Sequence, residues 1–237
     1  MKKMGIRFGV AILAFVLGVT AAFFYRAKRD VAVPRTPRLE IIQSETRACF
    51  PGKSIQVQVM GKLRFFPRVQ SSHDERFNDF REKWYSEHLK AMKEESMYVS
   101  SSKALESYRF LWLRSFDHPV VVRIWKTETA QFILLKEASG AGGYEPGHLI
   151  IDRTRQLDAA EWNAFVQRLD DSCYWNLPTE DPKESGFDGA QWVLEGVKDD
   201  RYHIVDRWTP TAGTFHDACF YALTLSGLKL GGDERVY

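Results

Sequence analysis

The chain has 237 residues, of which 33 are Lys or Arg and 31 are Asp or Glu, and its formal net charge is +2. Residues 1–38 hold eight of the basic residues and one acid, Asp30, which leaves 25 basic and 30 acidic residues for residues 39–237. Proteins that neutralise nucleic-acid phosphates normally show a basic face or stripe. The acidic excess of residues 39–237 therefore speaks against nucleic-acid binding.

An uncharged apolar run extends from Phe8 to Tyr25, with Lys2, Lys3 and Arg7 before it and a basic cluster directly after it. As a helix this run would rise about 27 Å, close to the bilayer hydrocarbon thickness of about 30 Å. We therefore predict an N-terminal membrane anchor in residues 1–25, embedded in the lipid bilayer through residues 8–25. A cleaved signal peptide is the alternative, but the length of the run and its basic flank favour a retained anchor.

Residues 26–38 are predicted to be a basic tether that Pro34 and Pro37 keep extended, and residues 39–237 a single globular domain. The orientation stays open. Counting basic residues on each side of the run favours a cytoplasmic body. The Met-Lys-Lys start is typical of a bacterial signal anchor, which would place the body in the periplasm.

Three cysteines, Cys49, Cys173 and Cys219, match neither redox motifs nor zinc clusters in their spacing. Three buried thiols are the favoured interpretation, because free Cys packs as a small apolar residue. If the body is exported, we expect a disulfide between Cys173 and Cys219. We predict no metal site and no cofactor.

Three helices are predicted from capping signals and apolar spacing. Ser72 to Glu75 has capping-box spacing and begins a helix over residues 74–97. Comparable start signals predict helices from residue 158 to about 171 and from 214 to about 227. The side chains expected to be buried are Phe77, Phe80, Trp84, Trp162, Phe165, Leu169, Trp192 and Leu194.

The intervening runs are rich in β-forming residues and predict strands over residues 120–126, 131–136, 149–153, 191–198 and 201–208. Residues 108–116 are nearly continuously apolar and fit either a strand or a helix. This order of elements predicts an α+β domain with a mainly antiparallel sheet, with its helices packed on one face.

Four stretches are similar to a group of bacterial proteins that carry an N-terminal membrane segment: YRFLWLR at 108–114, GGYEPG at 142–147, DGAQWVLEG at 188–196 and YHIVDRWTP at 202–210. The resemblance covers roughly residues 70–230. It implies a bacterial source and a membrane-tethered body, and it supplies no activity and no catalytic residues. With the anchor, it leads us to expect a single-pass inner-membrane protein, and the Met-Lys-Lys start favours a periplasmic body while the orientation stays open.

Common enzyme motifs are missing from the sequence. It has no P-loop, no H-E-x-x-H and no G-x-S-x-G. The glycine-rich residues 139–147 lack the helix start that would complete a phosphate site, and we expect them to form a wide loop between two strands, with glycines supplying positive φ.

The richest chemistry lies in the hairpin of residues 191–208. A two-residue turn at Asp199 and Asp200 would pair Glu195 with Ile204 and place Asp206 diagonally, about 7 to 8 Å from Glu195 on one face. Asp188 is near in sequence, and His203 would lie on the other face. The catalytic candidates are thus Asp188, Glu195, His203 and Asp206, and the binding candidates are Tyr202, Trp208 and Tyr144.

We expect these acids to be structural and to meet Arg114, Arg123 or another arginine in ion pairs. The predicted function is accordingly a membrane-tethered binding or accessory module of the bacterial envelope, with a protein or a glycan as partner. The alternative is a hydrolase, acting on a glycan, that uses the hairpin carboxylates. A hydrolase needs two or more of these acids in a concave pocket, whereas a module would show them paired with arginines.

Overall fold

The structure is a computed structural model that describes Cys49, residues 65–66, 75–98, 104–181, Gly186, 188–199 and 201–230. All of these residues belong to one compact unit, Thr46–Tyr237. The expected membrane helix at residues 8–25 and the tether at 26–38 lie outside the described residues. Within the described part of the chain, no helix combines the length and the apolar character needed to span a membrane.

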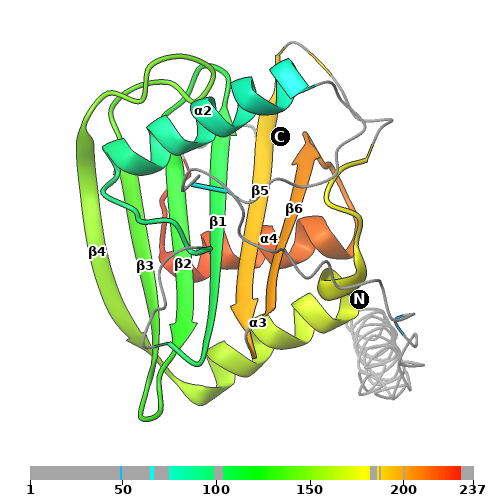
Figure 1. Ribbon diagram of the computed structural model, residues 1–237. Coiled ribbons are helices and arrows are strands. Elements are labelled where there is room, and N and C mark those ends of the chain that lie inside the picture. Colours follow the sequence, from blue (N-terminus) through cyan, green and yellow to red (C-terminus); the bar gives the residue numbers. More distant parts are fainter. Residues whose placement is uncertain are drawn as a thin grey trace, which may run out of the picture. The chain divides into compact units, whose positions relative to one another are not determined.

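Six strands form one antiparallel sheet in the order β4-β3-β2-β1-β5-β6 (Figure 1). The predicted α+β class with an antiparallel sheet is confirmed. Residues 108–116, which were ambiguous, contribute to the central strand β1. The strands are β1 (Glu106–Arg114), β2 (Val120–Lys126), β3 (Gln131–Ala138), β4 (Leu149–Leu157), β5 (Ala190–Lys198) and β6 (Arg201–Trp208).

Helices cover both faces of the sheet, so the expectation of helices on one face is wrong. Helices α3 (Ala159–Asp171) and α4 (Thr214–Ser226) pack on one face, while α2 (Glu75–Ala91) lies across the other (Figure 1). The cause is visible in β1, where Phe110 and Trp112 face α3 and α4 while Leu111 and Leu113 face α2. A strand that is apolar on both faces requires a cover on both.

The core between the sheet and helices α3 and α4 follows the sequence pattern. Asp158 and Glu161 form the expected capping box at the start of α3. Trp162, Phe165 and Leu169 of α3 are buried against the sheet, as are Trp192 and Leu194 of β5, which confirms the predicted burial of these five side chains.

Helix α2 is rotated relative to the prediction. Phe77 and Phe80 are 43% and 58% exposed and Trp84 is half-buried, so their expected burial is wrong for the first two and only partial for the third. The inward stripe runs instead through Tyr85, His88, Leu89 and Met92. The sheet beneath the N-terminal half of α2 presents polar side chains, among them Asp206, and the helix meets this carboxylate with Arg81 and Tyr85 rather than with phenylalanines.

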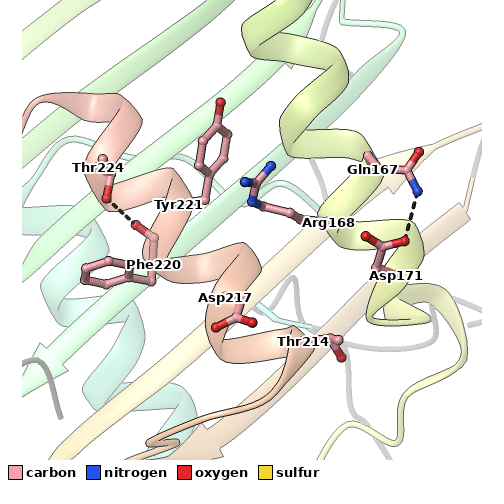
Figure 2. A pocket seen from close by; sticks show the side chains of 8 residues that line it. All are labelled: Gln167, Arg168, Asp171, Thr214, Asp217, Phe220, Tyr221 and Thr224. Atoms are coloured by element: carbon pink, nitrogen blue, oxygen red, sulfur yellow. Dashed lines mark hydrogen bonds between the residues drawn. The ribbon is translucent and has the colours of Figure 1, made fainter. Parts of the chain in front are cut away.

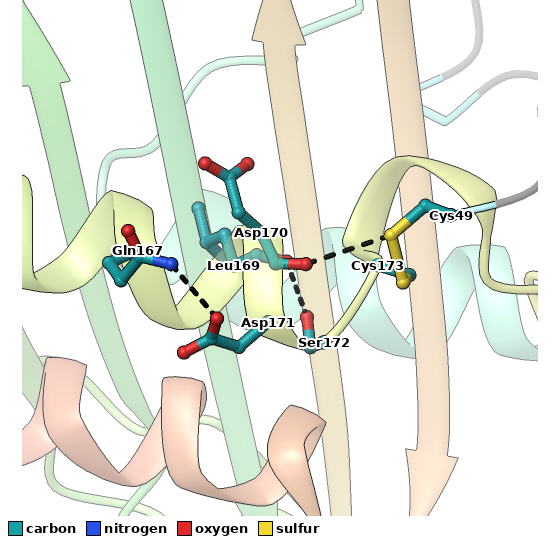
Figure 3. The surroundings of a disulfide bond; sticks show 7 residues. All are labelled: Cys49, Gln167, Leu169, Asp170, Asp171, Ser172 and Cys173. Atoms are coloured by element: carbon teal, nitrogen blue, oxygen red, sulfur yellow. Dashed lines mark hydrogen bonds between the residues drawn. A yellow bond between two sulfur atoms is a disulfide. The ribbon is translucent and has the colours of Figure 1, made fainter. Parts of the chain in front are cut away.

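The disulfide joins Cys49 to Cys173, with their Cα atoms 5.5 Å apart (Figure 3). Both expectations for the cysteines, three free thiols or a Cys173–Cys219 bridge, are therefore wrong. Cys173 caps the short 3₁₀ helix η1 (Tyr174–Asn176) directly after α3, whereas Cys219 is a free thiol buried in the core on α4. Burial raises the pKa of the Cys219 thiol, which disfavours its reactive thiolate form.

Candidate functional site

The β5–β6 hairpin has the register that the sequence predicts. Val197 pairs with Tyr202, Glu195 with Ile204 and Val193 with Asp206. Asp199, in the turn, has a φ of 49°, a left-handed conformation that tight hairpin turns require. Because side chains alternate along a strand, Glu195 and Asp206 share the face that α2 covers, and His203 lies on the opposite face.

Glu195 is completely buried in an ion pair with an arginine of the neighbouring strand. Arg109, its partner in the β1–β5 register, donates from Nε at 2.8 Å and from Nη2 at 2.5 Å to Glu195 Oε2. The Tyr202 hydroxyl donates to Glu195 Oε1 at 2.8 Å. Burial works against the charge of Arg109, but Glu195 and Glu94 outweigh it and raise the Arg109 pKa. Burial and the nearby Glu195 raise the pKa of Tyr202, so its hydroxyl stays protonated and donates.

Asp206 is buried in a second cluster beneath α2. Its carboxylate accepts from Arg81 and from the Gln191 amide, and from the Tyr85 hydroxyl at 3.0 Å. Arg81 also binds Glu180, with Nη1 2.7 Å from Oε1. Burial works against the charge of Arg81, but interactions with Tyr85, Asp206 and Glu180 outweigh it and raise the Arg81 pKa. Burial, reinforced by Asp206, raises the pKa of Tyr85.

The two hairpin carboxylates therefore lie on one face of the sheet, and each forms an ion pair with a different arginine. Glu195 is 0% and Asp206 4% exposed. Asp188 is exposed in the turn before β5, outside both clusters. The arrangement can hold the helix to the sheet, but it leaves neither buried carboxylate open to a substrate.

His203 lies on the α3 and α4 face and packs against the aromatic rings of η1. Its ring centroid is 5.1 Å from that of Tyr174 and 6.1 Å from that of Trp175. Burial lowers the pKa of His203 from its ordinary value of 6.5, and the nearby Arg207 lowers it further. The folded chain thus favours the neutral imidazole.

This lowered pKa makes stability depend on pH. Below about pH 6.5 the unfolded chain takes up a proton on His203 that the folded chain resists, so the free energy of unfolding falls until the pH reaches the folded pKa. We expect His203→Gln to remove this component, measured by urea unfolding at pH 7.5, 6.5, 5.5 and 5.0. His148→Gln, at an exposed histidine, is the control. Equal pH dependence in wild type and His203→Gln would contradict the expectation.

Trp208, one of the three binding candidates, is half-buried. Two glycines of the segment before β5 lie against its indole. A Cβ added to Gly186 would lie 2.3 Å from Trp208 Nε1, and one added to Gly189 would lie 2.9 Å from its ring carbon. The ring is thus packed against backbone on this side.

Tyr144, the third binding candidate, belongs to a group of exposed or half-buried aromatic side chains, Phe77, Phe80, Trp84, Phe116 and Tyr144, that we call the aromatic surface. On α2, the ring centroids of Phe77 and Phe80 are 6.4 Å apart, and those of Phe80 and Trp84 are 6.0 Å apart. Phe116, in the β1–β2 loop, and Tyr144, in the β3–β4 loop, are 61% and 65% exposed with centroids 6.1 Å apart. The Trp84 indole N–H donates to the Gly142 carbonyl at 2.8 Å and so joins the helix to the loops.

The glycines of the β3–β4 loop allow it to approach the β1–β2 loop closely. Gly142 N donates to Asp117 O at 2.9 Å, and Gly143 N donates to Ser115 O at 3.2 Å. A Cβ on Gly142 would lie 2.5 Å from the Arg114 carbonyl oxygen. The loop assignment is confirmed, but close backbone approach explains Gly142, whereas positive φ applies to Gly147, at 69°.

The sequence did not identify the aromatic surface as a unit. It placed Phe77 and Phe80 in the core and gave no role to Phe116. A signal was available, because the stripe through Tyr85, Leu89 and Met92 competes with the stripe through Phe77 and Phe80 on the same helix. Phe116 also precedes the turn-forming residues Asp-His-Pro, and side chains of such surface loops are usually exposed.

An open groove of about 560 Å³ lies between the outer sides of α3 and α4 (Figure 2). Within it, Arg168 stacks on the Tyr221 ring at 3.9 Å and donates to the Ala164 carbonyl at 2.7 Å. Gln167 donates to Asp171 at 2.9 Å. The groove contains none of the predicted site residues. Its lining is Gln167, Arg168, Asp171, Thr214, Asp217, Phe220, Tyr221 and Thr224.

Among the described residues, no group of three or more His, Cys, Asp or Glu side chains is arranged to hold a metal ion. The acids of β1, β5 and β6 are instead paired with basic side chains: Glu195 with Arg109, Asp206 with Arg81 and Glu106 with Lys198.

No protein-family model matches the chain, and no curated protein sequence matches it either. A search of solved structures finds a protein of Bacillus halodurans that is provisionally described as an adenylate cyclase. The match covers 65% of this chain and 89% of that one, with 10% identity and a TM-score of 0.19. A score this low carries no argument about fold or activity.

Proposed function

We propose that this protein is a membrane-tethered module of the bacterial envelope that binds a protein partner through the aromatic surface. The observation that carries the proposal is the exposure of Phe80, Phe116 and Tyr144, at 58%, 61% and 65%, on adjoining elements. Large apolar side chains gathered at one exposed place are typical of interaction sites, and aromatic residues are enriched at protein interfaces.

The chemistry around the aromatic surface favours a protein over a bilayer or a glycan. The exposed charges on α2 and the β3–β4 loop are of both signs, four acidic and three basic, whereas an anionic bilayer attracts a basic surface. The Trp84 indole N–H is engaged with Gly142, which leaves the Tyr144 hydroxyl as the one hydrogen-bonding group that these rings offer to the several hydroxyls of a sugar. A mixed-charge rim around apolar rings is the usual composition of a protein interface. The exposed charged residues of α2 and of the β3–β4 loop are Glu75, Arg76, Asp79, Lys83, Glu87, Lys90 and Glu145.

The disulfide supports a body on the periplasmic side. Disulfides persist in oxidising compartments such as the periplasm and are rare in the reducing cytosol. Cys49 lies 11 residues after the end of the proposed tether at residue 38, and its bond to Cys173 would fix the beginning of the body to the α3 end. This favours the signal-anchor orientation over the cytoplasmic one.

Photo-crosslinking in bacterial cells that produce the full-length chain tests the proposal. A photoreactive phenylalanine analogue replaces Phe80, and the control position is Phe220, which is 37% exposed on α4, across the sheet from α2. We expect one discrete protein adduct from position 80, lost when Phe116 and Tyr144 are both changed to Ser, and none from position 220. Adducts with lipid alone, or equal adducts from both positions, would contradict a protein partner at this surface.

The same substitutions should leave the fold intact. Phe116→Ser and Tyr144→Ser each remove an exposed side chain, so we expect the free energy of unfolding to change by no more than about 0.5 kcal/mol. Urea unfolding of each variant measures this. Trp84 is excluded from the set, because its bond to Gly142 holds the loop.

A further inference from the structure

Three cations from three adjacent strands converge on the face of the sheet that α2 covers. Arg109 on β1 lies directly opposite Arg123 on β2, and Lys136 follows on β3. Like charges directly opposite each other across two strands are destabilising. Such a pair requires an anion beside it.

The anion that meets these cations does not come from the sheet. Glu94, in the segment that follows α2, places Oε1 2.8 Å from Lys136 Nζ. Its Oε2 lies 3.5 Å from Arg109 Nη1 and 3.7 Å from Arg123 Nε. Glu94 is 5% exposed, so a single buried carboxylate from outside the sheet contacts cations on three strands.

The charges of this cluster do not balance. Arg109, Arg123 and Lys136 are positive, while Glu94 and Glu195 are negative, which leaves an excess of one positive charge. Glu195 is engaged by Arg109, through two N–H groups. Arg123 therefore depends on Glu94, and their 3.7 Å separation is too long for a hydrogen bond. Within the described part of the chain, buried Arg123 Nε has no hydrogen-bond partner.

Arg123 is the cation of this cluster that is most exposed to solvent. Its side chain is 33% exposed, whereas those of Arg109 and Lys136 are 0% and 8% exposed. Its guanidinium lies 5.1 Å from the centre of the Trp125 ring, which is half-buried. An anion arriving from solvent would reach Arg123 first.

The backbone that delivers Glu94 adopts a conformation that glycine prefers. Lys93 has a φ of 56°, and the N–H groups of Lys93 and Glu94 donate to the Lys90 and Leu89 carbonyls to end the helix. Lys136 Nζ also donates to the Lys93 carbonyl at 3.2 Å. A non-glycine residue in this region costs on the order of 1 kcal/mol and persists only where its surroundings enforce it.

We propose that Arg109, Arg123 and Lys136 form a receptor for an anionic group of a ligand, a carboxylate or a phosphate, and that Glu94 occupies this receptor in the ligand-free chain. The ligand enters beside Arg123 and displaces the Glu94 side chain into solvent. Arg109 stays in place, because Glu195 holds it. This site is independent of the proposed partner surface, and neither stands or falls with the other.

Calorimetric titration of the full-length chain with inorganic phosphate, and separately with acetate, tests the receptor. Chloride keeps the ionic strength constant, so that screening does not differ between the titrations. We expect Glu94→Gln, which removes the internal competitor, to bind one of the two anions at least tenfold more tightly than wild type. Adding Arg123→Met to Glu94→Gln should abolish this gain. Tighter binding of phosphate assigns a phosphorylated ligand, and tighter binding of acetate a carboxylate ligand.

Two results would overturn the receptor: no tighter binding of either anion by Glu94→Gln, or an equal gain in the variant that also lacks Arg123. If Glu94→Gln does not fold, wild-type hydrogen exchange decides. Displacement of Glu94 should then speed amide exchange at residues 93–96 as phosphate or acetate is added, relative to chloride at the same ionic strength. Unchanged exchange with both anions would overturn the proposal.

Discussion

The Arg109→Met variant is expected to lose about 3 to 5 kcal/mol of unfolding free energy, because it leaves the Glu195 carboxylate buried without its cation. Glu195 is 0% exposed and accepts two N–H hydrogen bonds from Arg109, so the substitution leaves a buried carboxylate without the opposite charge that compensates it. Glu94 loses its contact with Arg109 but keeps its ion pair with Lys136 at 2.8 Å, so its burial becomes less unfavourable than that of Glu195. Urea unfolding followed by circular dichroism measures the loss.

The double variant Arg109→Met with Glu195→Met is the matched control. It replaces both buried charges by apolar side chains of similar length, and such replacements are often neutral or stabilising. We expect it to recover most of the stability lost in Arg109→Met. Lys198→Met breaks the more exposed pair with Glu106, 3.2 Å apart, and should lose less than about 1 kcal/mol. A loss in Arg109→Met no larger than in Lys198→Met would show that Glu195 is not held as described.

Removing the disulfide is expected to cost about 2 to 5 kcal/mol. Cys49 and Cys173 are 124 residues apart, and closing a loop of this length restricts the unfolded chain by on the order of 5 kcal/mol in the chain-entropy model. The test compares wild type with Cys49→Ala combined with Cys173→Ala in urea unfolding.

A reducing agent and the third cysteine supply the controls for the disulfide. Dithiothreitol should lower the stability of wild type toward that of the double variant and leave the double variant unchanged. Cys219→Ala, which removes the free thiol, should keep the response to dithiothreitol. Insensitivity of wild type to full reduction would mean that the bridge contributes nothing to stability.

Local sequence signals were sufficient for the hairpin and for α3. A two-residue turn fixes a register, and alternation along the strands then assigns Glu195 and Asp206 to one face and His203 to the other. The capping box of Asp158 and Glu161 fixes the start of α3. These features depend on residues close together in the chain, which is why the sequence was enough.

Features that depend on distant residues were not accessible in this way. The bond between Cys49 and Cys173 joins residues 124 apart, and nothing in their spacing separates it from the other pairings. The rotation of α2 depends on Asp206, which lies far along the chain and attracts Arg81 inward. With Arg81 inside, Phe77 and Phe80 turn outward.

The candidate site was only partly foreseeable for the same reason. The sequence suggested that the hairpin acids would meet Arg114, Arg123 or another arginine, and the partners are two arginines that it did not name, Arg109 and Arg81. Glu94 gave no signal, because its role depends on three strands that assemble only in the fold. The aromatic surface likewise joins α2 to two loops that are separate in the sequence.

One comparison tests most directly whether the protein works through its aromatic surface rather than through its buried acids. It measures crosslinking from position 80 in cells, together with urea unfolding, for the Phe116→Ser and Tyr144→Ser double variant and for Glu195→Gln. We expect the aromatic double variant to keep its stability and lose the adduct, and Glu195→Gln to lose stability while its folded fraction still forms the adduct. Full crosslinking by a stable aromatic double variant, or loss of the adduct in a stable Glu195→Gln, would contradict this account.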